Sequence, residues 1–264
     1  MFLMFFTSCK TLKITGEYLD NPPSVVPKVA LSTDLNRNNW QHLDPINDSV
    51  PGMSVDKAYK ELIKDSEGQT VVVAVLDTGI DIKHEDLKDN IWTNKKEIPG
   101  NNIDDDKNGF VDDVYGWNFL GEAYYEQLEL TRLLGKGEDF PEKEDAQKDY
   151  DKRLAEARGE ETLKYYLNYD FKGRTTGDDP DNFEQTYYGD NKVEHSREDE
   201  SHGTHVAGII AAARNNNLGM KGVANNVEIM TLRVVPYGDE YDKDVALGII
   251  SVSYTHLTLP TIPG

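Results

Sequence analysis

Residues 201–213 read Ser201-His202-Gly203-Thr204-His205-Val206-Ala207-Gly208-Ile209-Ile210-Ala211-Ala212-Ala213. The segment begins with two imidazoles and a glycine and continues with small apolar residues, a composition that predicts a buried helix. His202 lies in the first turn of this helix, and His205 lies one helical turn further along. The helix is therefore predicted to carry an imidazole at its N-terminal end.

A second apolar segment lies upstream, at Val71-Val72-Val73-Ala74-Val75-Leu76. This unbroken, β-branched run is typical of a strand that is buried on both faces of a parallel sheet. It ends at Asp77, so a carboxylate is expected at the carboxyl end of the strand, where open α/β sheets place their sites. An Asp at a strand end, followed along the chain by a His at a helix start, supplies two members of a hydrolase triad.

Both segments resemble the subtilisin-like serine proteases (peptidase family S8). The resemblance lies in Ala74-Val75-Leu76-Asp77-Thr78-Gly79-Ile80-Asp81 and in His202-Gly203-Thr204-His205-Val206-Ala207-Gly208. It implies an α/β fold with a doubly wound, mostly parallel sheet. It also implies serine endopeptidase activity on protein or peptide substrates, in which Asp77 orients His202 and His202 takes the proton of a serine. Asp, His, Ser is the known chain order of subtilisin.

Each of the two residues also has an ordinary structural interpretation. Asp77 alone fits a turn or N-cap aspartate after a strand, and His202 alone fits a helix N-cap or a core histidine. Two long motifs in the right order, on the right elements, favour the protease.

The family's nucleophile lies in a Gly-Thr-Ser-Met-Ala-x-Pro motif. Neither this motif nor that of the oxyanion-hole asparagine occurs before Gly264. The resemblance covers about residues 50–250 and implies an N-terminal portion of a catalytic domain, truncated before the serine, with a sheet incomplete at the C-terminus. We expect this chain alone to be inactive, because loss of the serine costs on the order of 10⁶-fold in turnover in subtilisin.

The alternative function is a non-catalytic, calcium-binding surface lipoprotein module. The coding sequence beyond position 250 distinguishes the two hypotheses, because a downstream Gly-Thr-Ser motif supports the enzyme and a genuine stop supports the module. Residues 251–264 do not resemble the family, and we expect them to be a non-native tail that does not continue the helix beginning at Asp244.

Other elements are predicted from hydrophobic pattern. Residues 55–63 form a helix with Ser54 as its N-cap, and residues 227–235 form a strand. Residues from about 121 to 200 carry roughly two acids for each base, which is typical of an exposed surface. Helical character in residues 124–134 and 146–167 makes this segment a charged, helical insertion in the catalytic domain.

The ratio of acidic to basic residues restricts the classes of molecule that the chain is expected to bind. The chain has 28 Lys and Arg residues against 48 Asp and Glu residues, which gives a formal net charge of −20. This balance excludes nucleic acid as an expected partner, because phosphate binding needs clustered cations. It is compatible with divalent cations and with a secreted, soluble surface.

A calcium site is predicted in the loop Asp104-x-Asp106-x-Asn108-Gly109, followed by Asp112. Side-chain oxygens at alternate positions and a glycine at the bend match the first half of an EF-hand-type loop. Tyr115 stands where that loop carries its bidentate glutamate, so the match is incomplete. The alternative is a solvated acidic turn.

The resemblance implies a second calcium site, in which Asp86 and the loop of residues 215–220 supply the ligands, with Asn216 as the side chain. Zinc at His202 and His205 is not expected, because the helical zinc motif spaces its histidines at i and i+4 beside a glutamate.

Cys9 is the single cysteine and follows the apolar run Met1-Phe2-Leu3-Met4-Phe5-Phe6. This arrangement resembles the end of a bacterial lipoprotein signal, in which the cysteine is lipidated. Residues 1–9 are therefore interpreted as a signal remnant and residues 10–50, rich in Pro and Asn, as a linker to residues 51–250. The predicted location is the cell envelope or the exterior, with membrane attachment only through a lipid on Cys9.

Overall fold

The computed structural model describes residues 38–64, 68–137, 139–171, 174, 176, 178–195 and 200–256. The chain divides into two compact units, Met1–Ser66 and Glu67–Gly264. The predicted signal remnant with Cys9, most of the predicted linker, and residues 257–264 of the predicted tail lie outside the described residues. Within the described part, no helix is both long and apolar enough to cross a membrane.

Within residues 38–64, the described part of the first unit, there are three short helical elements. A 3₁₀ turn, η1 (Trp40–His42), precedes α3 (Val55–Ala58), which continues directly as the π-helical turn η2 (Tyr59–Ile63). The predicted helix is therefore confirmed in extent, although its second half is wound more loosely. Ser54 occupies the N-cap position with φ 59° and makes no side-chain capping bond, so the prediction of a serine cap was wrong.

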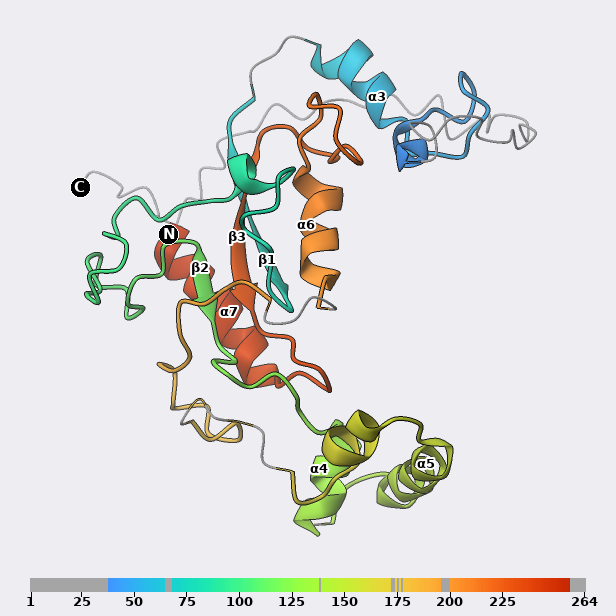
Figure 1. Cartoon of the computed structure of the whole chain (residues 1–264), viewed down its shortest axis with the longest axis vertical. Helices are drawn as coiled ribbons and strands as arrows, with labels where there is room; N and C mark the ends of the chain where they lie inside the picture. The colour runs from blue at the N-terminus through green and yellow to red at the C-terminus, as the bar shows by residue number, and fades with distance from the viewer. Residues whose placement is uncertain are drawn as a thin grey trace, which may run out of the picture. The chain divides into compact units, whose positions relative to one another are not determined.

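The second unit is built on a parallel sheet of three strands in the order β1-β3-β2 (Figure 1). The strands are β1 (Val71–Asp77), β2 (Gly116–Asn118) and β3 (Val227–Arg233). β1 and β3 confirm the two strands expected from their apolar runs. β2 was not predicted, since three residues are too few to show a pattern.

Two helices cover opposite faces of this sheet, α6 (His202–Ala211) and α7 (Asp242–His256) (Figure 1). Val75 of β1 and Ile229 of β3 pack with Ala207 and Ala211 of α6. Met230 and Leu232 of β3 point to the other face and pack with Leu247 of α7. Because both faces are buried, apolar residues follow one another along most of β1 and β3 instead of alternating with polar ones. The doubly wound α/β fold predicted from the sequence is confirmed.

The helix that begins before Asp244 does not end at residue 250. α7 runs to His256, and Ser251 lies buried within it, where its hydroxyl donates to the carbonyl oxygen of Gly248. The prediction that residues 251–264 do not continue this helix was wrong for residues 251–256. A hydroxyl that bonds back to its own helix lets serine occupy a buried helical position.

The insertion between β2 and α6 contains α4 (Glu129–Lys136), α5 (Lys143–Glu156) and the π turn η4 (Thr162–Tyr166). Residues 124–128 were expected to begin the first helix, but Tyr125 instead forms a parallel bridge with Tyr237, beyond the end of β3. The second predicted helix is interrupted after Glu156, and Gly159 adopts φ 86° in the break. Pairing with Tyr237 holds Tyr125 extended, which a local pattern does not reveal.

Candidate active site

Asp77 and His202 meet at the carboxyl edge of the sheet. Asp77 is the last residue of β1, and His202 is the first residue of α6. Nδ1 of His202 lies 2.9 Å from each carboxylate oxygen of Asp77, so an Nδ1–H can donate to the carboxylate. The side chain of Asp77 is 11% exposed and that of His202 is 74% exposed. The carboxylate is therefore enclosed, while the imidazole remains accessible.

Two glycines and a threonine allow this approach. A Cβ on Gly203 would overlap the carbonyl oxygen of Gly79 and lie 3.2 Å from the Cβ of Asp77, so only glycine lets α6 start this close to β1. The Gly203 N–H donates to Oγ1 of Thr78 at 3.3 Å, and the Thr78 N–H donates to the Asp77 carboxylate at 2.7 Å. Gly79 turns the chain away with φ 109°. The turn thus holds the Asp77 carboxylate through contacts that do not involve the imidazole of His202.

A buried cation that the sequence analysis missed lies beside this pair. Arg233 is the last residue of β3, in register with Asp77 on one neighbouring strand and with Asn118 on the other. It is 1% exposed, and burial lowers the pKa of its guanidinium. Glu200, two residues before His202, is 2% exposed, and its Oε1 lies 3.6 Å from Nη2 of Arg233.

We call Asp77, Asn118, Glu200, His202 and Arg233 the strand-end cluster. The one signal in the sequence was an arginine inside the apolar strand of residues 227–235. A charge in a strand that is buried on both faces requires partners, because an unpaired buried charge is very costly.

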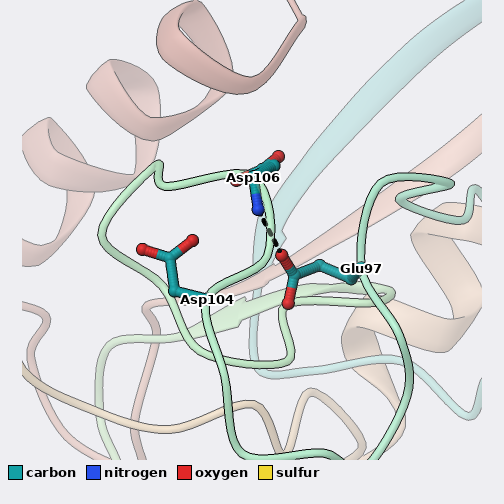
Figure 2. A group of neighbouring side chains, drawn as sticks. All are labelled: Glu97, Asp104 and Asp106. Carbon is teal, nitrogen blue, oxygen red and sulfur yellow. Dashed lines mark hydrogen bonds between the residues drawn. The ribbon is translucent and has the colours of Figure 1, made fainter.

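The predicted calcium loop brings some of its proposed ligands together. Carboxylate oxygens of Glu97, Asp104 and Asp106 lie within 4.8 Å of one another, with Glu97 reaching in from a neighbouring turn (Figure 2). Glu97 was not predicted. Asn108 lies in the same loop, where its N–H donates to Asp104 and to Asp106, both at 3.1 Å.

Asp112 has a different position in this loop. Its carboxylate accepts the backbone N–H groups of Gly100 at 2.8 Å and Asn102 at 2.9 Å, so it holds the preceding turn. It is not part of the group formed by Glu97, Asp104 and Asp106. Asp113 lies beside that group, and burial, reinforced by Asp106 and Glu97, raises its pKa to about 7. Asp113 therefore lies close enough to Asp106 and Glu97 for their charges to disfavour its ionisation.

The residues of the second predicted calcium site also meet. Nδ2 of Asn216 lies 2.6 Å from Oδ1 of Asp86, a residue that is 8% exposed. His202 and His205 do not form part of any group of three or more potential metal ligands within the described ranges.

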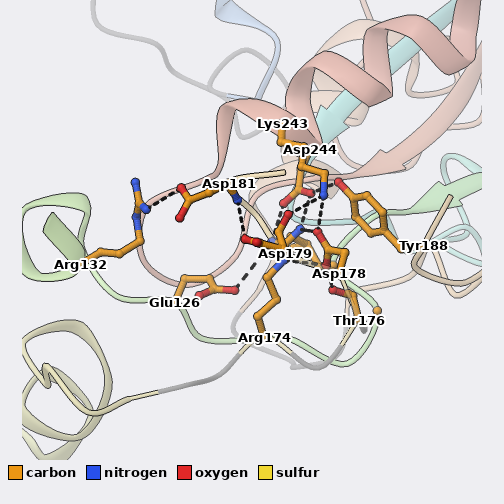
Figure 3. Close-up of polar contacts among 12 residues, drawn as sticks. Glu126, Arg132, Arg174, Thr176, Asp178, Asp179, Asp181, Tyr188, Lys243 and Asp244 are labelled. Carbon is orange, nitrogen blue, oxygen red and sulfur yellow. Dashed lines mark hydrogen bonds and ion pairs between the residues drawn. The ribbon is translucent and has the colours of Figure 1, made fainter. Parts of the chain in front are cut away.

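A second buried group of charges lies where the insertion meets the start of α7 (Figure 3). The Arg174 guanidinium binds the carboxylates of Asp178 and Asp244, with the closest contact 2.6 Å long, to Asp244. Lys243 Nζ donates to Asp178 at 2.8 Å, and Glu126 lies 3.9 Å from Arg174. We call Glu126, Arg174, Asp178, Lys243 and Asp244 the insertion network. Their side chains are 0–8% exposed, so the network fastens the insertion to the start of α7.

Comparison with known proteins agrees with this geometry. Residues 68–256 match the model of the peptidase S8 family, described as the subtilase family. The chain is similar to Subtilisin-like protease 1 of Plasmodium falciparum (isolate 3D7), with 28% identity over 177 residues, which are 67% of this chain and 16% of that protein. It is also similar to the Major intracellular serine protease of Bacillus subtilis (strain 168), with 39% identity over 83 residues, which are 31% of this chain and 24% of that protein. The match thus spans about a sixth of the length of the first of these relatives and a quarter of the second.

Proposed function

Because this chain belongs to the subtilase family, we propose that it supplies the aspartate and the histidine of a serine endopeptidase. The observation that supports this function best is the Asp77–His202 pair, in which Nδ1 of the histidine lies 2.9 Å from the carboxylate. The matched family and the similarity to named serine proteases agree with it.

The proposed chemistry follows from the enclosed position of the Asp77 carboxylate and the exposed position of the His202 imidazole. A carboxylate that accepts the Nδ1–H fixes the tautomer in which Nε2 is unprotonated and can act as a base. Nε2 of His202 then takes the proton of a serine hydroxyl as that oxygen attacks the peptide carbonyl, and returns it to the leaving amine. Asp77 remains ionised and stabilises the imidazolium. The exposure of the His202 side chain leaves the imidazole open to both partners.

The serine and the oxyanion donor come, in this proposal, from sequence outside these 264 residues. The experiment is to express the complete coding sequence and treat the protein with a fluorophosphonate probe, which labels only an activated serine. We expect labelling that is lost in a His202→Ala variant. Absence of labelling in a folded, calcium-binding protein would reject the enzyme and support the non-catalytic module.

We also propose that the loop binds calcium through Asp104, Asp106 and Glu97. Calcium prefers hard oxygen ligands, and this site offers three carboxylates. Asn108 and Asp112 were predicted as ligands, and in this proposal Asp112 holds the loop while Asn108 contributes its side-chain oxygen. Calcium would neutralise the clustered charge and stabilise the loop.

Calcium should therefore raise the melting temperature of the protein, because a ligand of the folded state stabilises it by mass action. Replacing both Asp104 and Asp106 by Asn should abolish the rise. Asp105→Asn is the matched control, since Asp105 accepts hydrogen bonds from Ile98 and Asn101 and lies outside the group of three. An undiminished rise in the double variant would reject this site and leave Asp86 with Asn216 as the alternative, which an Asp86→Asn variant tests in the same way.

For location, we propose the cell envelope, with a lipid on Cys9 as the anchor. The support is the position of the single cysteine, which follows an apolar run and the two small residues Thr7 and Ser8. A Cys9→Ser variant should move from the membrane fraction to the soluble fraction of cells that express the complete gene. Equal partition of both proteins would reject the anchor.

A further inference from the structure

The strand-end cluster contains a guanidinium that the proposed reaction does not use. Nε of Arg233 donates to the carbonyl oxygen of Thr78 at 3.0 Å. Nη1 donates to Oδ1 of Asn118 and to the carbonyl oxygen of Gly121, both at 3.3 Å, and Nη2 lies 3.6 Å from Oε1 of Glu200. The ring of Tyr124 lies 5.1 Å from the guanidinium carbon. All three nitrogens are therefore directed at separate segments of the chain.

Two of these segments carry the Asp–His pair. Thr78 directly follows Asp77, and Glu200 lies two residues before His202. The guanidinium therefore connects the chain that leaves β1 with the chain that enters α6. Its donors are fixed in one plane, so groups that bind to it are fixed relative to one another as well.

The remaining contacts hold the arginine itself in place. Asn118, at the end of β2, also donates from Nδ2 to the carbonyl oxygen of Gly121 at 2.9 Å and accepts the N–H of Leu120 at 3.0 Å. The carbonyl oxygen of Arg233 accepts the N–H of Phe119 at 3.0 Å. With its backbone in the central strand and its side chain bound on three sides, Arg233 has little freedom to move.

We propose that Arg233, with Glu200 as its counter-ion, is a positioning residue for the Asp77–His202 pair. It holds the end of β1 and the entry to α6 at the separation that the hydrogen bond between Nδ1 and the carboxylate requires. The role of this pair in proton transfer rests on the proposed function, whereas the hydrogen bond itself does not.

The test measures the hydrogen bond directly. In the full chain that the gene encodes, ¹⁵N-labelled at histidine, the His202 Nδ1–H proton is identified by its loss in a His202→Gln variant. Its exchange rate with water is then measured in Arg233→Met and Arg233→Lys. We expect exchange to accelerate about tenfold in Arg233→Met, as expected for loss of a hydrogen bond of ordinary net strength. Arg233→Lys should give a smaller acceleration, because lysine keeps the charge but not the planar fork.

Arg174→Met is the matched control, because Arg174 is another arginine with a largely enclosed side chain, 8% exposed, and is bound by carboxylates in the insertion network. It should destabilise the protein without changing exchange at His202. If Arg233→Met does not fold, the exchange rate of the His202 Nδ1–H proton in Arg233→Lys tests the proposal instead. Unchanged exchange in the folded Arg233 variants, or equal acceleration in Arg174→Met, would overturn the proposal. Because peptide hydrolysis is not measured, a protein without peptidase activity would reject the proposed function and leave this inference intact.

Discussion

The strand-end cluster and the insertion network both rest on pairing between arginine and carboxylate, but their side chains differ in exposure to solvent. Each pairs a buried arginine with at least one carboxylate, Arg233 with Glu200 and Arg174 with Asp178 and Asp244. In the insertion network every side chain is 0–8% exposed, and the ring of Tyr188 lies 5.5 Å from Arg174 and 4.5 Å from Lys243. In the strand-end cluster the imidazole of His202 remains 74% exposed.

This difference separates the proposed active site from a structural anchor. Charges that are enclosed and neutralised hold two segments together, but they offer nothing to an outside molecule. An accessible base held against an enclosed carboxylate can exchange protons with a substrate. Burial of charge is therefore a poor marker of function, and the exposed member of a buried group is a better one.

The largest expected effect is on kcat, and it tests whether the strand-end cluster and the insertion network have different roles. In the complete protein, His202→Ala should lower kcat by about 10⁶-fold, since the histidine of a triad acts as a unit with the serine. Arg174→Met should leave kcat per folded molecule unchanged, because the partners of Arg174 all lie at the junction of insertion and α7. Hydrolysis of a peptide substrate, normalised to folded protein, checks both. A comparable loss in Arg174→Met would make the insertion network part of the active site.

The next effect concerns stability. Asp244→Ala should lower the free energy of unfolding by about 3–5 kcal/mol, because it leaves Arg174 and Lys243 buried with too few anions. Urea denaturation measures the change. Asp242→Ala is the control, since Asp242 is an exposed aspartate in the same first turn of α7 and should cost about 0.3–1 kcal/mol. Equal losses would show that the network is no more than a set of surface ion pairs.

The third expected effect is a dependence of the free energy of unfolding on pH, through Glu126 of the insertion network. Burial raises the pKa of Glu126 from 4.5 to about 7, despite the nearby Arg174. The folded state therefore binds the proton more tightly than the unfolded state, so this contribution is fully present below about pH 4.5 and is lost as the pH rises through about 7. Relative to a Glu126→Gln variant, the wild-type protein should lose about 3 kcal/mol between these limits, since each unit of pKa shift corresponds to about 1.4 kcal/mol.

Denaturant unfolding of the wild-type protein and the variant across this pH range measures the difference. Asp113, whose pKa is also raised to about 7, is common to both proteins and cancels. Parallel stability curves would show that Glu126 titrates normally.

The smallest expected effect tests how α6 approaches β1. Gly203→Ala should destabilise the protein by about 1–3 kcal/mol, as overpacking does, because the new Cβ would overlap the Gly79 carbonyl oxygen. Gly208→Ala, in the same helix, meets no neighbouring atom within 4 Å and should stabilise it by about 0.4–1 kcal/mol. Thermal unfolding of the two variants distinguishes them. A neutral Gly203→Ala would mean that the Asp77–His202 distance does not depend on this close approach.

The sequence by itself determined the elements that carry the site. The apolar run that ends at Asp77 and the small-residue helix that begins at His202 are local patterns, because a strand buried on both faces and a helix packed closely against it restrict every consecutive residue. Chain order and motif then predicted that the two residues belong to one pair. The predicted calcium loop is likewise a local pattern, since Asp104, Asp106 and Asn108 are spaced within a single turn.

Only the tertiary structure decided which side chains surround the pair. Asn118, Glu200 and Arg233 are separated by long segments of chain, and no local pattern relates them. Arg233 and Asn118 meet because parallel strands align their carboxyl ends at one edge of the sheet, in the register Asp77, Arg233, Asn118, and Glu200 reaches Arg233 from the segment before α6. Tyr125 remains extended for a similar reason: its pairing with the distant Tyr237 outweighs local propensities of a few tenths of a kcal/mol per residue.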